Sequence, residues 1–272
     1  MHPFDTDISL TPQGEQDFAA IVSDHWSVNG IPDGGYLMAM VASAMMRRGE
    51  KQATPMLTAN FISRTRPGRA VIQVTPMVRS ARFDRFDGRL IQGGKERVRM
   101  FGTFAGQNND AGEPVCPNTR QEKIPPPVAG FDDCIRIPNL PRYTIFQNFD
   151  TRLDPACTGW MQDGDLTEKS EIKGWIQFED ERPLDSLAIT LMADAFPPAV
   201  LASHGMVAWV PTLEMSISIR TLPVTRRVKC IFRTHFISCG LLEEDGEIWD
   251  EADRIVAVSR QFADFRPTAP EQ

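Results

Sequence analysis

The most regular alternation of apolar and polar residues in the chain follows Pro211. Apolar side chains fall on one side of this segment and polar ones on the other; the apolar positions are Leu213, Met215, Ile217 and Ile219. A period of two residues is typical of a β-strand with one face in the core. The pattern predicts a half-buried strand that begins at Thr212 and ends near Arg220.

A carboxylate lies among the apolar residues of a second predicted element, which precedes this strand in the chain. Leu187, Leu191 and Asp194 recur at spacings of four and three, which predicts a helix with Asp194 in line with its apolar face. Asp185 or Ser186 would cap this helix. An ionised carboxylate that faces a core costs free energy unless it is paired or hydrogen-bonded, so we expect polar partners around Asp194.

The first hundred residues contain the same kinds of element. A turn at 32–35 precedes an almost wholly apolar segment, 36–48, which predicts a buried helix. Three strand candidates follow, separated by turns that contain glycine: 57–63, 70–81 and 97–105. From 107 to 141 the composition shifts to turn formers and a run of prolines. This segment is predicted to link an N-terminal module, 1–106, to a C-terminal module, 142–268.

The two predicted modules resemble each other in sequence. A shift of 156 residues lays LTANFISRT on LEMSISIRT and the first helix on the segment around Asp194, and a shift of 158 lays GTFAG on RQFAD. One copy has polar residues where the other mostly has packing residues: Asp194 against Met38, Thr212 against Met56, and Gln261 against Thr103. The pattern predicts an α+β chain in which one helix-and-sheet module is duplicated, with a functional site formed by the polar residues of one copy.

At these residues the sequence resembles the acyl-CoA thioesterase II branch of the hotdog superfamily, the double-hotdog or thioesterase-like proteins. The resemblance extends from about residue 24 to 266 and is clearest in DGGYLMAMVASAM, MLTANFISRTRPG, PTLEMSISIR and VSRQFADFR. It implies a double hotdog fold, in which each module wraps a curved antiparallel sheet around a central helix and the two sheets join. It also implies that two such chains form a homodimer.

The resemblance also implies a reaction, the hydrolysis of an acyl-CoA by an activated water without cofactor or metal. In that family an Asp, a Thr and a Gln position the water, and by motif these fall on Asp194, Thr212 and Gln261. The backbone N–H groups of Gly34 and Gly35, near the start of the first central helix, are candidates for binding the substrate carbonyl. One departure is Asp33, which stands where relatives often carry His or Asn.

Composition narrows the range of partners. With 36 acidic and 29 basic residues the net charge is -7, which disfavours nucleic acid, because phosphate binding relies on clustered Lys and Arg. The apolar runs are too short for a membrane span and the first residues lack a secretion signal, so we expect a soluble, cytoplasmic protein without a membrane partner. The five cysteines have no CxxC spacing and the histidines no metal-binding spacing, so no metal site is expected.

Two other functions remain as alternatives. A hotdog enoyl-CoA hydratase would pair a carboxylate with a histidine, and His204 or His235 beside Asp194 would support it. A non-catalytic acyl-CoA or fatty-acyl binding protein would keep the tunnel without turnover. A serine hydrolase is not indicated, because the chain has no G-x-S-x-G motif and Ser203 is adjacent to His204 in sequence.

One basic stretch is a candidate for contact with CoA. The segment 79–89 contains several arginines and is typical of a solvated hairpin. Its side chains at Arg79, Arg82 and Arg85 are candidates for meeting a CoA phosphate.

Overall fold

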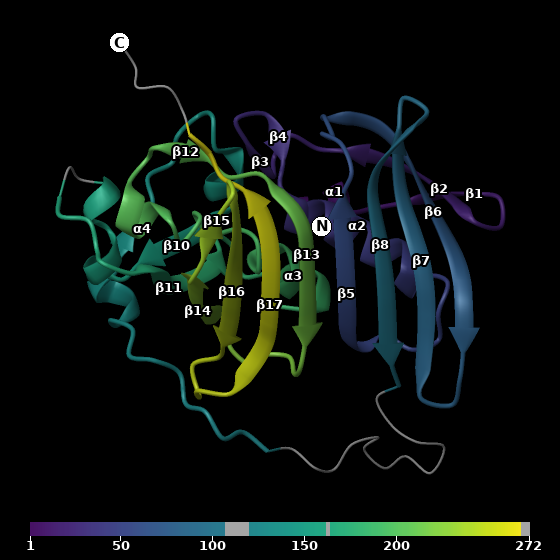
Figure 1. Cartoon of the computed structure of the whole chain (residues 1–272). Coiled ribbons are helices and arrows are strands. Elements are labelled where there is room, and N and C mark those ends of the chain that lie inside the picture. The colour runs from purple at the N-terminus through teal and green to yellow at the C-terminus, as the bar shows by residue number, and fades with distance from the viewer. Residues whose placement is uncertain (107–119, 162–163, 268–272) are drawn as a thin grey trace.

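One antiparallel sheet runs through both halves of the chain (Figure 1). The computed structural model describes residues 1–106, 120–161 and 164–267. The first half contributes β1 (Thr11–Gln13), β2 (Asp17–Val22), β5 (Ala53–Phe61), β6 (Gly68–Arg79), β7 (Phe83–Gln92) and β8 (Lys95–Ala105). The second half contributes β9 (Ile135–Arg136), β10 (Phe149–Leu153), β11 (Ser170–Phe178), β13 (Thr212–Ile219), β14 (Arg227–Thr234), β15 (Ile237–Ser238), β16 (Leu241–Trp249) and β17 (Ile255–Asp264). Two small sheets pair β3 (Ser27–Val28) with β4 (Ile31–Pro32) and β12 (Ala208–Trp209) with β18 (Arg266–Pro267).

Both halves of the large sheet have the same topology. From the junction outward the first half runs β5-β8-β7-β6-β2 and the second runs β13-β17-β16-β14-β11. If the five strands of each half are numbered by their order along the chain, their order across the sheet, starting at the junction, is 2-5-4-3-1 in both halves. The predicted duplication and the α+β class are therefore confirmed.

The junction between the halves has the symmetry that a duplication requires. β5 pairs with β13 so that Thr58 faces Ser216 and Asn60 faces Glu214. A shift of 156 takes Thr58 to Glu214 and Asn60 to Ser216, so each pair maps onto the other under a two-fold relation. The hydroxyls of Thr58 and Ser216 lie 3.0 Å apart across the seam. The shift found for these strands in the sequence is thus the correct one.

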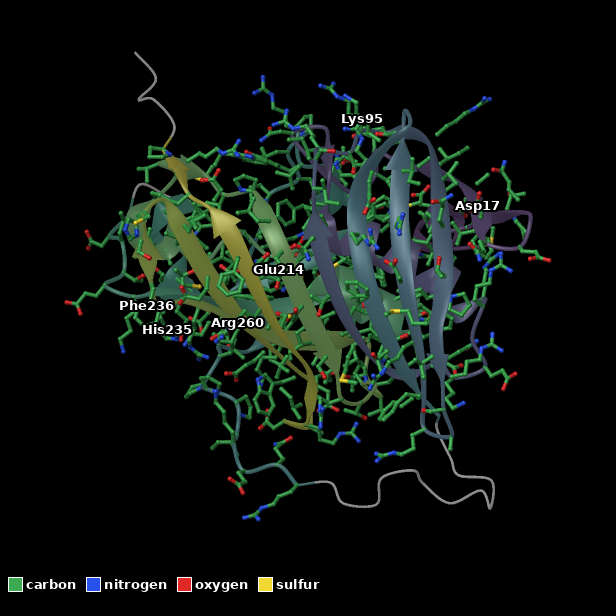
Figure 2. The ribbon with its side chains drawn as sticks, turned by 45° about the vertical axis from the view of Figure 1, so that its right-hand side comes forward. Asp17, Lys95, Glu214, His235, Phe236 and Arg260 are labelled. Carbon is green, nitrogen blue, oxygen red and sulfur yellow. The ribbon has the colours of Figure 1, made fainter. Side chains whose placement is uncertain are left out.

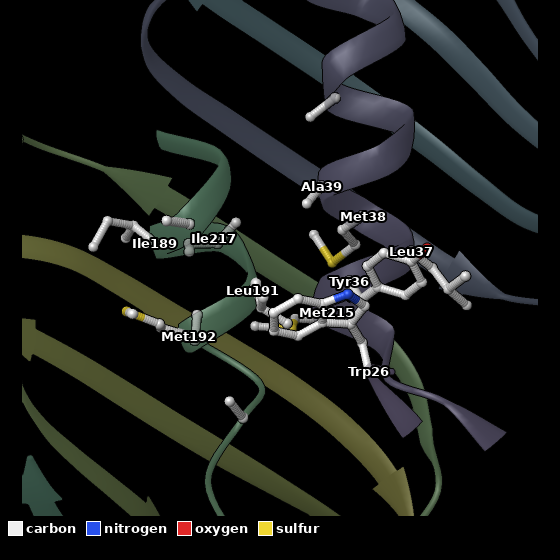
Figure 3. Packing of buried hydrophobic residues seen from close by; sticks show 14 of the residues in the cluster. Trp26, Tyr36, Leu37, Met38, Ala39, Ile189, Leu191, Met192, Met215 and Ile217 are labelled. Atoms are coloured by element: carbon white, nitrogen blue, oxygen red, sulfur yellow. The ribbon is translucent and has the colours of Figure 1, made fainter. Parts of the chain in front are cut away.

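Two central helices lie side by side on one face of the sheet, which we call the inner face (Figures 1 and 3). α2 (Gly34–Met46) is capped by Asp33, whose Oδ1 accepts from the N–H of Tyr36 at 3.1 Å. Residues 35–45 of this helix are all buried, as its apolar sequence predicts. α3 (Ser186–Met192), capped by Asp185, packs against α2, β5 and β13. Two shorter helices are α1 (Pro3–Asp7) and α4 (Leu201–His204).

The second central helix is shorter than predicted. α3 ends at Met192, and Asp194 lies in the turn that follows, where its N–H donates to the carbonyl of Leu191 at 3.1 Å. The prediction that Asp194 continues the helix is therefore wrong, as is the overlay of the first helix on this segment. The Pro197-Pro198 pair gives the physical reason, because a proline disfavours helical backbone before it and supplies no N–H.

The predicted linker lies partly outside the described residues, which resume at 120. Its later part contains β9, which pairs with β10 at one edge of the large sheet. The boundaries 1–106, 107–141 and 142–268 stay predictions. One hydrophobic cluster extends through both halves, from Phe4 to Ala257. None of the helices in the described residues combines the length and hydropathy needed to cross a bilayer.

Candidate functional site

A β-bulge turns Thr212 toward the inner face. Thr212 pairs with Ala263, whereas Glu214 pairs with Phe262, so Leu213 is an extra residue in its strand. Leu213 is 41% exposed, and the prediction that it packs in the core is wrong. Because paired residues of antiparallel strands share a face, Thr212 lies on the inner side with the buried Ala263. Without the bulge, Thr212 would point to the outer face.

Three neighbouring strands carry a chain of polar side chains on this inner face. Thr212 Oγ1 donates to Gln261 Oε1 at 2.9 Å, and Gln261 Nε2 donates to Glu244 Oε1 at 2.8 Å. The second oxygen of Glu244 accepts from the backbone N–H of Ala199 at 2.5 Å. The three side chains come from β13, β17 and β16, and we call them the polar ladder. The structure thus brings Thr212 and Gln261 together, as the family motif implies.

Glu244 is a member of this site that the sequence did not reveal. Its segment, LLEEDGEIWD, contains several acidic residues, and the strand register shows that Glu244 is the one that meets Gln261. Burial raises the pKa of Glu244 to about 7, although the donors Ala199 and Gln261 oppose the shift. Alternation along β16 was the available signal, since it places Glu244 on the same side as the buried Leu242 and Ile248.

Asp194 lies at the amino end of α2, the central helix of the other module. The N–H of Gly35 donates to Asp194 Oδ2 at 2.9 Å, one residue before the N–H that Asp33 caps. Adjacent N–H groups of one helical turn therefore hold two carboxylates. Burial raises the pKa of Asp194 to about 6, while hydrogen bonds from Gly35 and Asp33 oppose the shift. Burial, followed by the charge of Asp194, raises the pKa of Asp33 well above its ordinary value.

The two carboxyl groups affect each other's titration. The charge of Asp194 raises the pKa of Asp33, whereas a hydrogen bond from Asp33 lowers the pKa of Asp194, so the pair favours a proton on Asp33 and the charge on Asp194. Hydrogen bonds from Asp33 and from the Gly35 N–H both stabilise the Asp194 carboxylate. The positive end of the α2 dipole acts in the same direction.

The paired glycines are required by this close approach. A Cβ on Gly34 would lie 2.7 Å from Asp194 Oδ2, and one on Gly35 would lie 2.8 Å from the carbonyl oxygens of Thr190 and Leu191. The start of α2 thus rests directly on the end of α3. The N–H of Gly35 donates to Asp194 here, so binding of a substrate carbonyl by Gly34 and Gly35 stays a prediction.

Asp194 and the polar ladder are linked through the protein. Ala199, whose N–H donates to Glu244, follows Asp194 with four residues between them. The charge of Asp194 also contributes to the raised pKa of Glu244. Within the described residues no hydrogen bond joins Asp194 directly to Thr212 or Gln261.

The structural counterpart of Gln261 differs from the one expected. Gln261 pairs with Met215, and Met100 pairs with Ala59, which is the equivalent of Met215 under the shift of 156. Met100 is therefore the counterpart, and it is fully buried. Thr103, the residue matched by the shift of 158, is out of phase with Met100 and belongs to the outer face. The assignment of Thr103 is wrong because the inward-facing residues of β8 have even numbers, whereas Gln261 and the inward-facing residues near it in β17 have odd numbers. An even shift such as 158 therefore matches an outward-facing residue of β8 to an inward-facing residue of β17.

The corrected register sharpens the contrast between the modules. Glu244 pairs with Gln261 and Gly88 pairs with Met100, so Gly88 occupies the equivalent of the Glu244 position. A Cβ there would lie 2.6 Å from the side chains of Val41 and Met45 on α2. In the first module, apolar side chains therefore occupy the space that the polar ladder occupies in the second.

The histidines have other partners. His204 Nδ1 lies 2.8 Å from Ser203 Oγ, and the His235 ring lies tilted beside that of Phe236, with 6.4 Å between the ring centroids. Across the described ranges no hydrogen bond or ion pair connects a histidine to Asp194. The carboxylate–histidine pair that a hydratase would need is therefore not formed there.

Family comparison assigns both halves of the chain. Residues 22–105 match the acyl-CoA thioesterase N-terminal domain and residues 125–263 match the acyl-CoA thioesterase C-terminal domain. The chain belongs to the acyl-CoA thioesterase family. The resemblance found in the sequence is thereby confirmed, and Asp194, Thr212, Gln261 and Glu244 all lie within the matched ranges. No curated protein matches the chain.

Solved structures show the fold of this acyl-CoA thioesterase family member. A putative thioesterase II from Thermobifida fusca superimposes with a TM-score of 0.87 at 20% identity, covering 97% of this chain and 98% of that one. A hot dog fold protein of unknown function from Alicyclobacillus acidocaldarius gives 0.86 at 20% identity, covering 99% and 100%. An acyl-CoA thioesterase II from Mycobacterium marinum gives 0.77 at 15% identity, covering 98% and 100%. The double hotdog fold is confirmed.

Proposed function

We propose that this protein hydrolyses an acyl-CoA to the free acid and CoA with a water activated by Asp194. Thr212 and Gln261 would orient that water by hydrogen bonds. The observation that carries the proposal is the placement, in one module only, of the Asp194 carboxylate at the amino end of α2 and of the hydrogen-bonded polar ladder on the inner face. Membership of the acyl-CoA thioesterase family supports the same reaction class.

The electrostatics of Asp194 suit a general base. A base acts best when its pKa lies near the working pH, and burial has raised the pKa of Asp194 to about 6. At pH 7 the carboxylate is still mostly ionised and can accept the proton of the attacking water. The charge of Asp194 raises the pKa of Asp33, which favours a proton on Asp33 and the negative charge on Asp194.

The polar ladder gives Gln261 a defined orientation. Glu244 can only accept when ionised, so it fixes the Gln261 amide with Nε2 toward itself and Oε1 toward Thr212. A water near Thr212 and Asp194 would then meet oriented acceptors and donors. Release of CoA requires little acid catalysis, because a thiol of pKa about 8.5 leaves readily as thiolate.

A panel of acyl-CoAs from acetyl to palmitoyl, plus an aromatic one, tests this function by thiol release. Asp194→Asn keeps the size and shape of the side chain and removes the carboxylate that acts as the base. We expect hydrolysis by the native protein and a loss of about 100-fold or more in kcat for the variant. Unchanged turnover in Asp194→Asn would refute the assignment of the base.

The binding alternative is separated by the same panel. Thermal stabilisation by an acyl-CoA without thiol release would favour an acyl-CoA binding protein over an enzyme. Conversion of an enoyl-CoA to its hydroxyacyl-CoA would favour a hydratase; this reaction is monitored as a loss of the absorbance of the conjugated thioester.

We also propose that two copies form the homodimer implied by the family resemblance, which light scattering of the purified protein would test.

A further inference from the structure

A basic surface lies at one end of the sheet in an otherwise acidic protein. The segments 62–69 and 92–97 contain five basic residues and one acidic residue, although the chain has a net charge of -7. The five, which we call the basic rim, are Arg64, Arg66, Arg69, Lys95 and Arg97. Within the described residues none of them forms a salt bridge, and all but Arg97 are exposed. Their charges are therefore available to an anionic ligand.

The backbone of the basic rim is fixed by hydrogen bonds between its two segments. The N–H of Ile62 donates to the carbonyl of Arg97 at 2.8 Å, and Arg97 Nη1 donates to Ser63 Oγ at 3.1 Å. Gln92 clamps the other end, because its Oε1 accepts from the N–H of Arg66 at 3.0 Å and its Nε2 donates to the carbonyl of Arg66 at 2.7 Å. A surface that is already ordered loses little entropy when it binds a ligand.

The basic rim begins where the candidate site ends. Phe61, the last residue of β5, would lie 2.8 Å from a Cβ on Gly34, and the Asp194 carboxylate lies 2.7 Å from the same position. Asn60 pairs with β13 only two residues after Thr212. The chain leaves the sheet at this point and enters the basic rim within three residues. Figure 2 shows Lys95 at this end of the strands.

The arginines that the sequence suggested for this role lie elsewhere. Arg79, Arg82 and Arg85 lie at or near the β6–β7 turn, and Arg85 pairs with Thr103 near the far end of β8. β8 begins at Lys95, so this turn is roughly 30 Å from the basic rim at about 3.3 Å per residue. Arg79 also donates to the carbonyl of Arg48 at 2.7 Å. These side chains are separated from Asp194 by the length of the strands.

We propose that the basic rim binds the phosphate groups of the adenine nucleotide in CoA while the thioester reaches Asp194. This inference rests on the proposed function. Arginine forms paired, charge-assisted hydrogen bonds with phosphate oxygens, and three of the five residues are exposed arginines. The chemistry fits a ligand with several phosphates joined by an uncharged arm to the reacting group.

The test compares two substrates with the same acyl group. Acyl-CoA carries the phosphates, whereas the acyl N-acetylcysteamine thioester lacks them. We expect the double variant Arg64→Ala/Arg66→Ala to raise KM for acyl-CoA about tenfold, leave kcat within about twofold, and leave kcat/KM for the short thioester unchanged. The matched control is Arg82→Ala/Arg85→Ala, which removes the same charge at the other end of the strands and should change neither substrate.

A binding measurement separates this inference from the proposed function. Adenosine 3′,5′-bisphosphate should bind the native protein in calorimetry at low ionic strength, and Arg64→Ala/Arg66→Ala should weaken its Kd about tenfold. That loss would support the basic rim even if no thioester were hydrolysed. Equal loss of activity on both substrates, equal weakening in the control variant, or unchanged nucleotide affinity in Arg64→Ala/Arg66→Ala would overturn the inference.

Discussion

Replacement of Glu244 by glutamine gives the sharpest test of the polar ladder. Glu244 is 4% exposed and accepts two hydrogen bonds, one from Gln261 and one from the N–H of Ala199. Glutamine keeps the size of the side chain but never ionises and offers only one acceptor oxygen. Two effects on stability are therefore expected, one that depends on pH and one that does not.

The pH-dependent effect follows from the raised pKa of Glu244. An ordinary glutamate has a pKa of 4.5, and burial raises that of Glu244 to about 7. Between these values the folded protein holds a proton that the unfolded chain has lost, so the native free energy of unfolding falls as pH rises. At about 1.4 kcal/mol per pKa unit, the fall is about 3 kcal/mol by pH 8. Glu244→Gln removes this fall.

The pH-independent effect has the opposite sign. In the variant one donor, the N–H of Ala199 or the amide of Gln261, faces an NH₂ group in place of an oxygen. Loss of a buried hydrogen bond of this kind costs about 1–3 kcal/mol. We therefore expect Glu244→Gln to be less stable than the native protein at pH 5 and to recover most or all of that difference by pH 8.

Urea unfolding of both proteins at pH 5 and pH 8 measures this change. The quantity to compare is the difference in unfolding free energy between native protein and variant at each pH, because other titrating groups contribute equally to both. A difference that stays constant across this range would refute the account of Glu244 as a buried, titrating acceptor. Glu243→Gln on the same strand is a matched control, since Glu243 does not face the inner side.

Three further predictions concern the amino end of α2. The acid limb of kcat/KM should fall with an apparent pKa near 6, because Asp194 must lose its proton to act as base; a pH profile of thiol release that shows no titration between pH 5 and 7 would contradict this. Asp33→Asn should retain activity, since an amide can both cap Tyr36 and donate to Asp194, whereas Asp33→Ala should lose about 1 kcal/mol of stability in thermal unfolding and move the acid limb to higher pH. Gly35→Ala should destabilise the fold by about 2 kcal/mol or more, because the new Cβ meets backbone carbonyls of α3 that cannot rotate away; a melting temperature equal to that of the native protein would show that the helices have room.

Local pattern was sufficient for the elements and their repetition. The strand after Pro211 and the buried helix at 36–48 follow from periodicity alone, and their structural counterparts are β13 and α2. The shift of 156 also identified the strands that meet at the junction. The helix around Asp194 was predicted too long, because its periodicity continues past the point where the following prolines end it.

The amino-acid sequence was enough to predict the duplicated α+β frame, the family, and Asp194, Thr212 and Gln261 as candidates, because residue types and local periodicity can be read directly from it. How these residues face one another followed from the three-dimensional structure. The bulge at Leu213 turns Thr212 inward, and the pairing of β17 with β16 selects Glu244 among several nearby acids. Bulges and cross-strand register arise from contacts between residues distant in sequence, so no local pattern encodes them.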